Sequence, residues 1–572
     1  MPGTKSAPAQ RGRLGHKVIR HGVRALWALV VTSTLVPTLA GQSLIYRFFG
    51  AEGDVLGTGV AFVGDLDGDG YDDIAGGARD AGVGNEVGMI RAWSGRTGGV
   101  LWSYYGSAAV DYLGSSVSAA GDVDGDGFAD VIGGAPFESG SLAPGLARLL
   151  SGRDGSLLRT FSGDGRGDQF GRAVAGGGDL DGDGFCDVVV GAPFGDANGF
   201  DSGYVRAFSG RSGQTLWTVA GEAVSDRFGL AVANAGDVNR DGFDDVIVGA
   251  SVPSRAYVLS GRDGTRIWLL SGATNSSFGS AVGGAGDVDR DGYPDLVVGA
   301  PMAAAPGAQA GEARLYSGRT GLQIRIVATG NTNDRLGTSV SCAGDVDGDG
   351  HDDVLVGSIL SDLPTTDAGS VRVFSGADGS SLWTFLGPMT QSAFGTSVAG
   401  GGDIDGDGYA EIAVGAPSDA TAASHAGSIS VHDMLRSGTP AIARRVGAGC
   451  VGSNGHLPRI GAIDRPFLGR SFTLTLRGGR ALAPVVLDLG LPIELPLAGL
   501  GMPGCTLRAS TGLFAFVHTT DAFGMVQGAA IPVPNDTTLI GATLAAQWVC
   551  IDAGANLLGL TLSDALMLRL GS

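Results

Sequence analysis

An acidic nine-residue segment of the form Asp-x-Asp-x-Asp-Gly-x-x-Asp recurs seven times in this chain of 572 residues. Successive copies lie 50 to 58 residues apart and begin at Asp65, Asp122, Asp179, Asp237, Asp287, Asp345 and Asp403. Carboxylates at alternate positions of a tight turn can point at one centre, and hard cations such as Ca2+ take six or more oxygen ligands. The glycine at position six permits the sharp bend. The series therefore predicts a repeat architecture with a metal loop in every repeat.

The expected ligands are the carboxylates of positions one, three, five and nine and the main-chain carbonyl of position seven. Two copies depart from this plan, because Asn239 replaces the second Asp and Glu411 replaces the last one, but both still offer oxygen. About seven Ca2+ ions are expected. The full ligand set is Asp65, Asp67, Asp69, Tyr71 and Asp73; Asp122, Asp124, Asp126, Phe128 and Asp130; Asp179, Asp181, Asp183, Phe185 and Asp187; Asp237, Asn239, Asp241, Phe243 and Asp245; Asp287, Asp289, Asp291, Tyr293 and Asp295; Asp345, Asp347, Asp349, His351 and Asp353; and Asp403, Asp405, Asp407, Tyr409 and Glu411.

The acidic segment has two other interpretations. An EF-hand needs a bidentate Glu at position twelve, but that position holds Gly or Val in every copy, from Gly76 to Val414. A single copy could equally be a solvated turn that binds nothing. Seven copies in one register favour metal binding.

The apolar runs around each loop predict four short strands per repeat. In the third repeat, alternating apolar residues from Phe170 to Val174 precede the loop, and a β-branched run from Val188 to Pro193 follows it. A third strand, a Ser-Gly-x-x-Gly turn and a fourth strand come next, as in Val371 to Phe374, Ser375 to Gly379 and Leu382 to Phe385. Runs of period two around turns indicate antiparallel strands. Repeats of this size and content indicate an all-β, seven-bladed β-propeller.

The fourth strands predict how the ring closes. The seventh repeat ends at Ser428 to His432 without a clear fourth strand, whereas Ser43 to Phe49 resembles a fourth strand that precedes the first repeat. We predict that this N-terminal segment completes blade seven, which leaves no strand edge exposed at the seam. The competing segment is Ala441 to Val446.

At this point a family resemblance is evident. The succession Phe-Gly, Gly-Asp-Val-Asp-Gly-Asp-Gly and Val-Gly-Ala-Pro resembles the FG-GAP repeat of the integrin alpha-chain N-terminal propeller and its bacterial relatives, over roughly residues 42 to 435. The resemblance implies that the metal loops join strands one and two on the lower face. It also implies that ligands bind on the upper face, formed by the loops after Gly-Ala-Pro and between blades. Integrin alpha chains carry metal loops in only some blades, whereas all seven repeats have one here. No inserted ligand-binding domain and no C-terminal membrane helix are expected, so receptor signalling is not implied.

The N-terminal residues predict export. Residues 1 to 24 contain six Lys or Arg and no acidic residue, Ala25 to Val36 form a mostly apolar core, and Thr38-Leu39-Ala40 is a small-residue cleavage site. This pattern is typical of a secretory signal peptide over residues 1–40. An uncleaved anchor is the alternative, although the apolar stretch is short for a membrane span. A secreted, extracellular or cell-surface location is therefore expected, without a membrane span after cleavage.

The overall charge excludes one class of partner. The chain has 58 acidic and 38 basic residues, a formal net charge of -20. Binding of nucleic acid needs a surplus of Lys and Arg at the phosphates, so no nucleic-acid partner is expected. The propeller is assigned to residues 41–440, and we expect it to be a monomer.

Residues 446–572 have few charges and several alternating apolar runs, and we predict a small β-sandwich. Their Gly-Ala-Gly-Cys, Gly-Met-Pro-Gly-Cys and Ile-Pro-Val-Pro-Asn-Asp segments are similar to a recurring C-terminal module of large secreted bacterial proteins. Surface sorting and a passive cap are the two roles considered. In an oxidising compartment Cys450 is expected to pair with Cys505, with Cys550 left as a buried thiol. Cys186 and Cys342, in blades three and six, are expected to be unpaired core residues.

Two sequence features could be mistaken for binding motifs. Arg166-Gly167-Asp168 spells a tripeptide that integrins bind, but Asp168 occupies a position that is also Asp in other repeats. We interpret it as a turn residue. Trp102, Trp217, Trp268 and Trp383 recur at one fourth-strand position and could form a sugar-stacking platform, but packing between blades explains them better.

The predicted function is a calcium-binding scaffold for adhesion to an extracellular protein or glycan. The alternatives are a passive structural surface protein and a Ca2+-dependent polysaccharide-acting enzyme. No His-Glu-x-x-His or Gly-x-Ser-x-Gly motif occurs, so no catalytic residue is assigned. The expected binding surface consists of the variable upper-face loops, at Arg79 to Gly88, Phe137 to Gly145, Phe194 to Gly203, Met302 to Gly311, Ile359 to Gly369 and Ser418 to Gly427.

Overall fold

The computed structural model describes residues 43–434 except 83–85, 138–142, 305–306 and 407–409, together with ten strands between residues 442 and 569. The predicted signal peptide, residues 1–40, lies outside the described residues. The described residues form strands, turns and loops, and include no helix that is long and apolar enough to cross a membrane.

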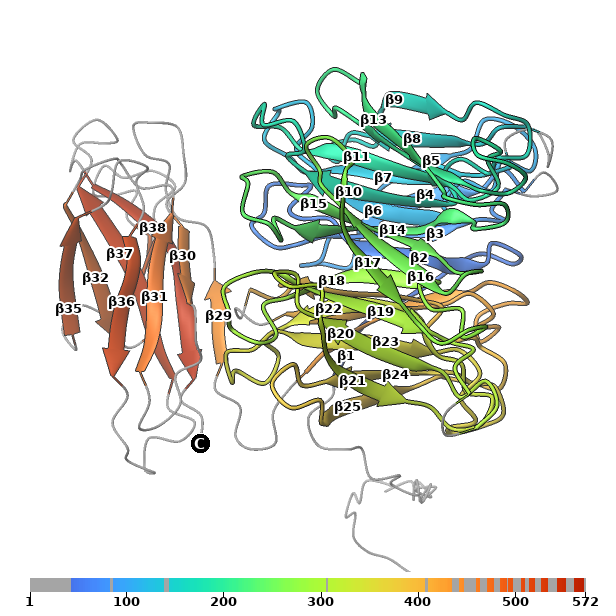
Figure 1. Ribbon diagram of the computed structural model, residues 1–572. Helices are drawn as coiled ribbons and strands as arrows, with labels where there is room; N and C mark the ends of the chain where they lie inside the picture. The colour runs from blue at the N-terminus through green and yellow to red at the C-terminus, as the bar shows by residue number, and fades with distance from the viewer. Residues whose placement is uncertain are drawn as a thin grey trace, which may run out of the picture. The chain divides into compact units, whose positions relative to one another are not determined.

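Seven four-stranded antiparallel sheets form a β-propeller, which confirms the predicted fold (Figure 1). Blade one contains β2 (Leu56–Phe62), β3 (Ile74–Ala78), β4 (Met89–Trp93) and β5 (Val100–Tyr105). Blade two contains β6 (Ser116–Gly121), β7 (Asp130–Ala135), β8 (Leu146–Leu150) and β9 (Leu157–Ser162). Blade three contains β10 (Ala173–Gly178), β11 (Asp187–Ala192), β12 (Tyr204–Phe208) and β13 (Thr215–Ala220). Blade four contains β14 (Phe228–Gly236), β15 (Asp245–Ala250), β16 (Arg255–Leu259) and β17 (Arg266–Ser271).

The remaining three blades continue the order. Blade five contains β18 (Ala281–Gly286), β19 (Asp295–Ala300), β20 (Glu312–Tyr316) and β21 (Gln323–Thr329). Blade six contains β22 (Leu336–Gly344), β23 (Asp353–Ser358), β24 (Ser370–Phe374) and β25 (Ser381–Leu386). Blade seven contains β26 (Ser397–Gly402), β27 (Glu411–Ala416), β28 (Ser428–Asp433) and, from the other end of the propeller sequence, β1 (Ser43–Phe49).

Burial explains the different sequence patterns of the four strands. The second strand of each blade is covered on both faces by neighbouring blades, so all six residues of β11 are buried and its sequence is a continuous β-branched and small-residue run. Runs of this kind suit a strand that has no solvent-exposed face. The fourth strand is the outer edge, and β13 accordingly mixes exposed and buried residues.

The N-terminal strand closes the ring as predicted. β1 pairs antiparallel with β28, from Ser43 opposite Asp433 to Phe49 opposite Ser428. The competing segment is excluded from this role, because β29 (Ile442–Val446) pairs with β38 (Leu560–Arg569) instead. Blade seven is therefore built from both ends of the propeller sequence, so its edge is covered and the ring has no free seam.

Two glycines per blade set the spacing between neighbouring blades. A Cβ added to Gly134, at the end of strand two, would lie 1.8 Å from the carbonyl oxygen of Gly171 in the next blade. The same clash recurs around the ring, and at the seam a Cβ on Gly415 would lie 2.2 Å from the oxygen of Gly57. Each Phe-Gly or Leu-Gly glycine also has a positive φ, such as 86° at Gly171, which residues with a side chain rarely adopt. The repeated glycines are therefore required by backbone contact between blades.

The recurring tryptophans join neighbouring blades rather than forming a surface platform. The indole N–H of Trp102 donates to the carbonyl of Gly152 at 2.6 Å, and Trp217 reaches Gly261 in the same way at 2.6 Å. Both side chains are buried. In blade seven, Tyr46 of β1 takes this place and donates its hydroxyl to the carbonyl of Arg96 at 2.8 Å. The interpretation of the tryptophans as packing residues is confirmed.

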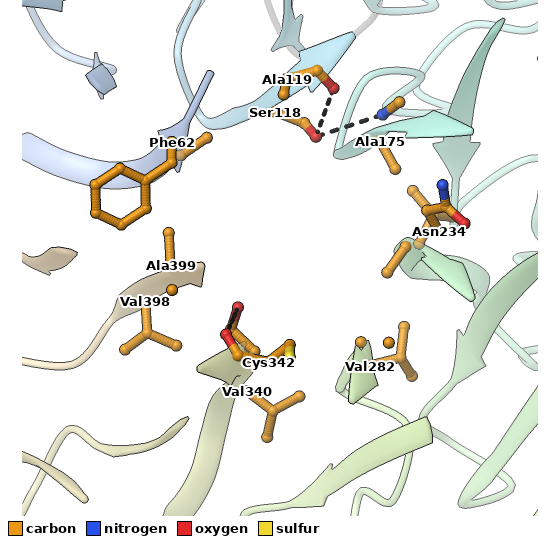
Figure 2. A pocket seen from close by; sticks show the side chains of 18 of the residues that line it. Phe62, Ser118, Ala119, Ala175, Asn234, Val282, Val340, Cys342, Val398 and Ala399 are labelled. Atoms are coloured by element: carbon orange, nitrogen blue, oxygen red, sulfur yellow. Dashed lines mark hydrogen bonds between the residues drawn. The ribbon is translucent and has the colours of Figure 1, made fainter. Parts of the chain in front are cut away.

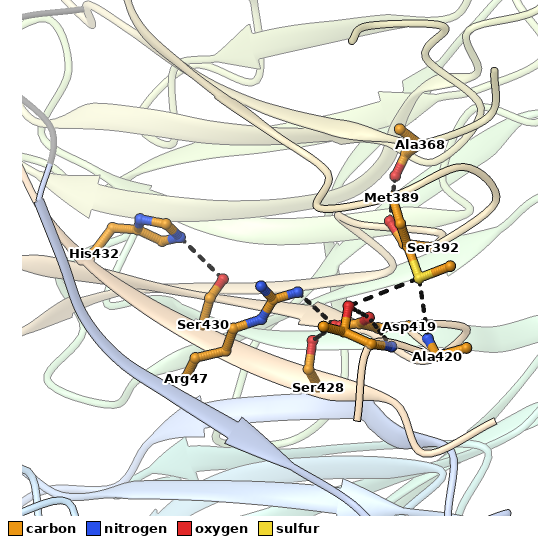
Figure 3. Close-up of polar contacts among 10 residues, drawn as sticks. Arg47, Ala368, Met389, Ser392, Asp419, Ala420, Ser428, Ser430 and His432 are labelled. Carbon is orange, nitrogen blue, oxygen red and sulfur yellow. Dashed lines mark hydrogen bonds and ion pairs between the residues drawn. The ribbon is translucent and has the colours of Figure 1, made fainter. Parts of the chain in front are cut away.

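A buried ion pair holds β1 in place (Figure 3). Arg47 Nη2 lies 2.6 Å from Asp419 Oδ2, and the Asp419 side chain is fully buried. Ser428 donates its hydroxyl to the same carboxylate oxygen at 2.6 Å. Burial and the nearby Arg47 lower the pKa of His432 to about 4, so this histidine is neutral at physiological pH and adds no competing positive charge. The positive charge of Arg47 on the N-terminal strand is thus paired with the negative charge of Asp419 in blade seven.

The C-terminal strands form three sheets. One has the order β29, β38, β37 (Thr543–Ile551), β32 (Pro484–Gly490) and β35 (Phe514–Thr519). The second sheet contains β30 (Arg459–Ala462), β31 (Ser471–Arg477) and β36 (Val526–Pro532). The third contains β33 (Pro492–Pro496) and β34 (Thr506–Ala509).

The sandwich and the domain boundaries stay predictions. Cys450 and Cys505 lie outside the described residues, whereas Cys186 and Cys342 are unpaired as expected.

We expect Gly299→Ala to lower the free energy of unfolding by about 1–3 kcal/mol, the usual cost of overpacking a dense interior. A Cβ at this position would lie 2.1 Å from the carbonyl oxygen of Gly337 in blade six. Gly283→Ala is the matched control, because its nearest neighbour would be 3.4 Å away. Urea denaturation of both variants measures the difference. Equal stabilities would show that blade contact does not require the glycine.

Arg47→Ala should cost about 3–5 kcal/mol, because it leaves the buried Asp419 carboxylate without its counter-charge. Arg255→Ala is the control, since the Arg255–Glu222 pair, at 3.6 Å, is largely exposed on both sides and such pairs contribute about 0–1 kcal/mol. Thermal and urea unfolding would compare the two variants. A loss at Arg47 no larger than that at Arg255 would contradict the proposed importance of this contact.

Candidate metal loops and the upper face

The first aspartate of each loop organises the turn. In copy three, Asp179 Oδ1 accepts hydrogen bonds from the N–H groups of Gly182 at 2.7 Å and Asp183 at 3.1 Å, and Oδ2 accepts one from Gly184 at 3.0 Å. Gly182 and Gly184 have φ values of 77° and 84°. The two glycines therefore let the chain turn back so that its N–H groups surround one carboxylate.

The third and fifth positions each use one oxygen for the turn. Asp181 Oδ1 accepts the N–H of Asp183 at 3.0 Å, and Asp183 Oδ1 accepts the N–H of Phe185 at 3.0 Å. Among the described residues, the second oxygen of each carboxylate has no hydrogen-bond donor. These side chains therefore keep an oxygen available for a cation.

Three carboxylates of one loop lie close together in copies one, two, three, five and six, and the positions involved differ between copies, whereas the ligand assignments stay predictions. In copies one, two, three and six, oxygens of positions one, three and nine lie within 4.8 Å of one another. In copy five the converging positions are one, three and five, that is, Asp287, Asp289 and Asp291. In copy seven, residues 407–409 lie outside the described residues, so Asp407 and Tyr409 stay predictions.

The ninth position is a buried carboxylate with two main-chain anchors. Asp187 is fully buried, and its Oδ2 accepts the N–H of Leu180 at 2.7 Å while Oδ1 accepts that of Gly210 at 2.9 Å. Gly210 belongs to the turn between strands three and four, so this side chain joins the loop to that turn. The sequence interpretation included the carboxylate as a ligand but missed this second role.

Burial without a counter-charge raises the pKa of these carboxyls. Desolvation raises the pKa of Asp73 to about 7 and that of Asp187 to about 6, although the main-chain N–H groups lower both. Neighbouring loop aspartates raise the two values further. Asp245, Asp295 and Asp353 follow the same pattern, each with a pKa raised to about 7. A bound cation would supply the missing positive charge and favour the ionised form.

One buried oxygen provides a test of whether a cation fits. In copy five Arg290 stands at position four, and Asp287 Oδ1 is buried with no hydrogen-bond partner among the described residues. An unpaired buried carboxylate oxygen is costly. A hard cation held by Asp287, Asp289 and Asp291 would satisfy it, so the donor set fits such an ion.

In copies one to six, the side chain of position seven links its loop to neighbouring segments. The guanidinium carbon of Arg211 lies 4.5 Å from the centre of the Phe185 ring, within the range of a cation–π contact. The same ring edge lies against Gly125 of the preceding loop. Blade six differs from this pattern at both residues, because His351 replaces Phe or Tyr at position seven and Ala377 replaces the arginine. His351 Nδ1 instead lies 2.8 Å from the carbonyl oxygen of Val288 in the preceding loop.

Position eight supplies a further link that sequence analysis missed. Asp352 Oδ2 accepts the N–H of Asp287 in the preceding loop at 2.8 Å. Asp72 Oδ2 accepts the N–H of Asp403 at 2.9 Å, across the seam of the ring. The sequence contains a signal for this link, because position eight is an aspartate only in certain repeats. The lower-face loops are therefore connected to one another as well as to their own blades.

The Arg-Gly-Asp tripeptide is confirmed as a turn. Asp168 is buried, and its Oδ2 accepts the N–H of Gly165 at 2.8 Å. Asp226 makes the equivalent bond to Ala223 at 2.7 Å. A carboxylate used inside its own turn cannot be presented to a partner.

The central channel is lined by the first strand of every blade (Figure 2). Its cavity volume is about 530 Å³. Most of the lining side chains are small; Phe62 is the large one, and the polar ones are Ser118, Asn234, Ser341 and Cys342. Burial raises the pKa of the Cys342 thiol to about 12, so it is not a thiolate at neutral pH.

Comparison with known proteins agrees with this geometry. The FG-GAP repeat model matches residues 113–145, 170–208, 228–270, 278–316, 337–374 and 394–432, which fall in blades two to seven. The propeller is built from FG-GAP repeats. The repeat model does not match blade one, although that blade has the same four strands and the same loop. Blade one has Gly-Ala-Arg in place of Gly-Ala-Pro.

Integrin alpha chains are among the similar proteins. The chain is 35% identical to integrin alpha-V of Gallus gallus over 233 residues, 37% of this chain and 22% of the relative. It is 31% identical to integrin alpha-4 of Xenopus laevis over 261 residues, 44% of this chain and 20% of the relative. It thus spans about a fifth of the length of these relatives. The likeness shows an integrin-like FG-GAP propeller.

Removing divalent cations should lower the melting temperature steeply. Sites of the extracellular class, with Kd of roughly 0.1–1 mM, would each contribute about 1–2 kcal/mol at a few millimolar Ca2+. Asp181→Asn should cost only about that amount, because the other loops remain. Calorimetry with Ca2+ and with excess chelator measures both effects. A melting curve that chelator leaves unchanged would show that the loops are turns that bind no metal.

Proposed function

We propose that this protein is a calcium-stabilised, exported binding scaffold that attaches to an extracellular protein or glycan through the upper face of its propeller. The observation that carries the proposal is the difference between the loops on the two faces of the propeller. Carboxylates converge in the loops between strands one and two, whereas the loops between strands two and three, on the opposite face, differ in length and sequence from blade to blade.

Calcium is the proposed ion because of the donor chemistry. The converging groups described in copies one, two, three, five and six consist of aspartates, and oxygen donors suit hard cations such as Ca2+. The proposed ligands are the loop residues predicted from the sequence, with about seven ions in all. When bound, the ion supplies positive charge among carboxylates whose pKa values burial has raised.

The binding role is supported by the relatives and by the rigidity of the frame. Integrin alpha chains are among the similar proteins, and we transfer an adhesion or ligand-binding role to this propeller as a proposal. Contacts between blades hold the strands that carry the upper loops. Variable loops on a rigid frame are a common arrangement for recognition. Export rests on the predicted signal peptide, and we expect the mature chain to be a monomer.

A glycan and protein array tests the proposal. The full mature chain would be applied with Ca2+ and with chelator, and we expect a restricted set of ligands that is retained in Ca2+ and lost without it. A variant in which Phe200, the exposed aromatic residue of the blade-three upper loop, is replaced by Ser should lose ligands while keeping its melting temperature. An array without any reproducible ligand would instead favour the passive structural role.

A further inference from the structure

The acidic loops of blades five and six, residues 287–295 and 345–353, are joined by hydrogen bonds at their ligand residues. Asp352 Oδ2 accepts the N–H of Asp287 at 2.8 Å, and the N–H of Asp352 donates to the carbonyl of Asp287 at 3.4 Å. Asp287 is the first expected ligand of loop five, and Asp352 immediately precedes Asp353, the last expected ligand of loop six. Loop six therefore holds the first ligand of loop five by its main chain.

Arg290 makes a connection in the opposite direction. Its Nε donates to the carbonyl of Gly350 at 2.6 Å, and its Nη2 donates to the carbonyl of Asp349. The N–H groups of the same two residues donate to the carboxylate of Asp345, from Gly350 at 2.8 Å and from Asp349 at 3.0 Å. Asp345 is the first expected ligand of loop six. Residues 349 and 350 thus connect an arginine of loop five to the first ligand of loop six.

Arginine at position four distinguishes two copies from the others. This position is Gly in copies one, two, three, six and seven, whereas it is Arg240 in copy four and Arg290 in copy five. The two arginines have φ values of 57° and 60°, in the region that favours glycine. Both side chains donate to a carbonyl of the next loop, Arg240 to Gly292 and Arg290 to Gly350. A hydrogen bond between loops is therefore what the arginine adds in place of glycine.

The first ligand of loop five has fewer anchors within its own loop than its counterpart in loop three. Asp179 Oδ1 accepts two N–H groups of its own turn, whereas Asp287 Oδ1 is buried and has no hydrogen-bond partner among the described residues. Asp287 Oδ2 keeps the N–H of Gly292 at 3.0 Å. The position of Asp287 therefore depends more strongly on Asp352 and on a cation that satisfies the buried oxygen.

Loops two and three, residues 122–130 and 179–187, provide a reference junction within the same chain. Position four of loop two is Gly125, and position eight of loop three is Cys186. Among the residues that the structure describes, no hydrogen bond or ion pair joins these two loops. The Phe185 ring lies against Gly125, where an added Cβ would be 2.8 Å from it. The polar connection between loops five and six is thus not a general property of neighbouring blades.

We propose that the Ca2+ sites of loops five and six form a cooperative pair, in which Arg290 and Asp352 transmit the ordering of one loop to the first ligand of the other. The inference rests on the proposed function, because it requires both loops to bind the ion. An ion in either loop fixes residues that hold the other loop, so the second ion has less conformational entropy to overcome. Arg290 and Asp352 supply no ligand and are positioning residues.

Hydrogen–deuterium exchange of the full mature chain over a Ca2+ series tests the coupling, because protection can be followed separately in peptides that contain each loop. Asp347→Ala removes a carboxylate from loop six and should raise the Ca2+ midpoint of loop five. For two sites of equal affinity, the expected rise is the square root of the coupling factor, or about 2- to 12-fold for the range typical of linked sites. Asp289→Ala should raise the midpoint of loop six by the same factor, because coupling is reciprocal.

A double variant tests the two positioning residues. Arg290→Gly with Asp352→Ala introduces residues that other copies carry at positions four and eight. In this background, Asp347→Ala should leave the midpoint of loop five unchanged. Arg319→Gln is the charge control, because Arg319 Nη1 lies 3.9 Å from Asp291 Oδ2 within blade five and forms no hydrogen bond with loop six among the described residues. The coupling should persist in this variant.

Asp181→Ala in loop three is the reference, and it should not change the midpoint of loop two. Equal shifts at this junction and at loops five and six would overturn the proposed pair, as would a loop-five midpoint that Asp347→Ala leaves unchanged. A shift that persists in the double variant would overturn the role of Arg290 and Asp352. Unchanged melting temperatures in Ca2+ would show that the variants fold. Protection that depends on Ca2+ independently in each loop would reject this inference alone, whereas protection without Ca2+ dependence in any loop would also reject calcium binding in the proposed function.

Discussion

Backbone contact between neighbouring blades is the constraint on which the rest of this structure depends. Gly191 of blade three approaches the carbonyl of Gly229 so closely that an added Cβ would lie 2.1 Å from it. Because the contact recurs at every junction, each blade has one allowed position relative to the next. Fixed junctions of this kind bring the ring to closure at Gly415 and Gly57, where β1 covers the last edge. Close backbone packing also explains why the second strands are continuous buried runs.

The lower-face loops add a second layer of connections to this frame. Asp187 ties its loop to Gly210 in the turn between strands three and four, and Asp352 reaches the loop of the preceding blade. Arg211 and Phe185 stack where two loops meet. These contacts bring acidic side chains close together, so that their negative charges repel one another. Burial and this repulsion both raise the pKa values of the carboxyls at position nine. A bound cation would convert the repulsion into attraction, so metal binding and stability of the ring should be coupled.

The upper face has a different relation to the frame. Its loops begin and end at strands whose positions the glycine contacts and the strand-four residues hold, and their sequences differ from blade to blade. The Asp168 turn shows that even an apparent recognition tripeptide there can serve the frame. Contacts of this kind identify the upper-face residues that support the blades.

The sequence by itself determined the number of repeats, the four-strand plan and the place of the acidic loops. These features follow from local periodicity and from glycines at fixed spacing, which need no knowledge of distant contacts. The sequence left two candidates for the closing strand, and the pairing of β1 with β28 decided in favour of Ser43–Phe49. The tertiary structure alone decided which carboxylates converge, for example positions one, three and five in copy five. It alone revealed the double anchor of Asp187 and the link from Asp352 to Asp287. The physical reason is that each of these contacts joins residues on different turns or different blades, whose approach depends on how the whole ring closes and not on any local pattern.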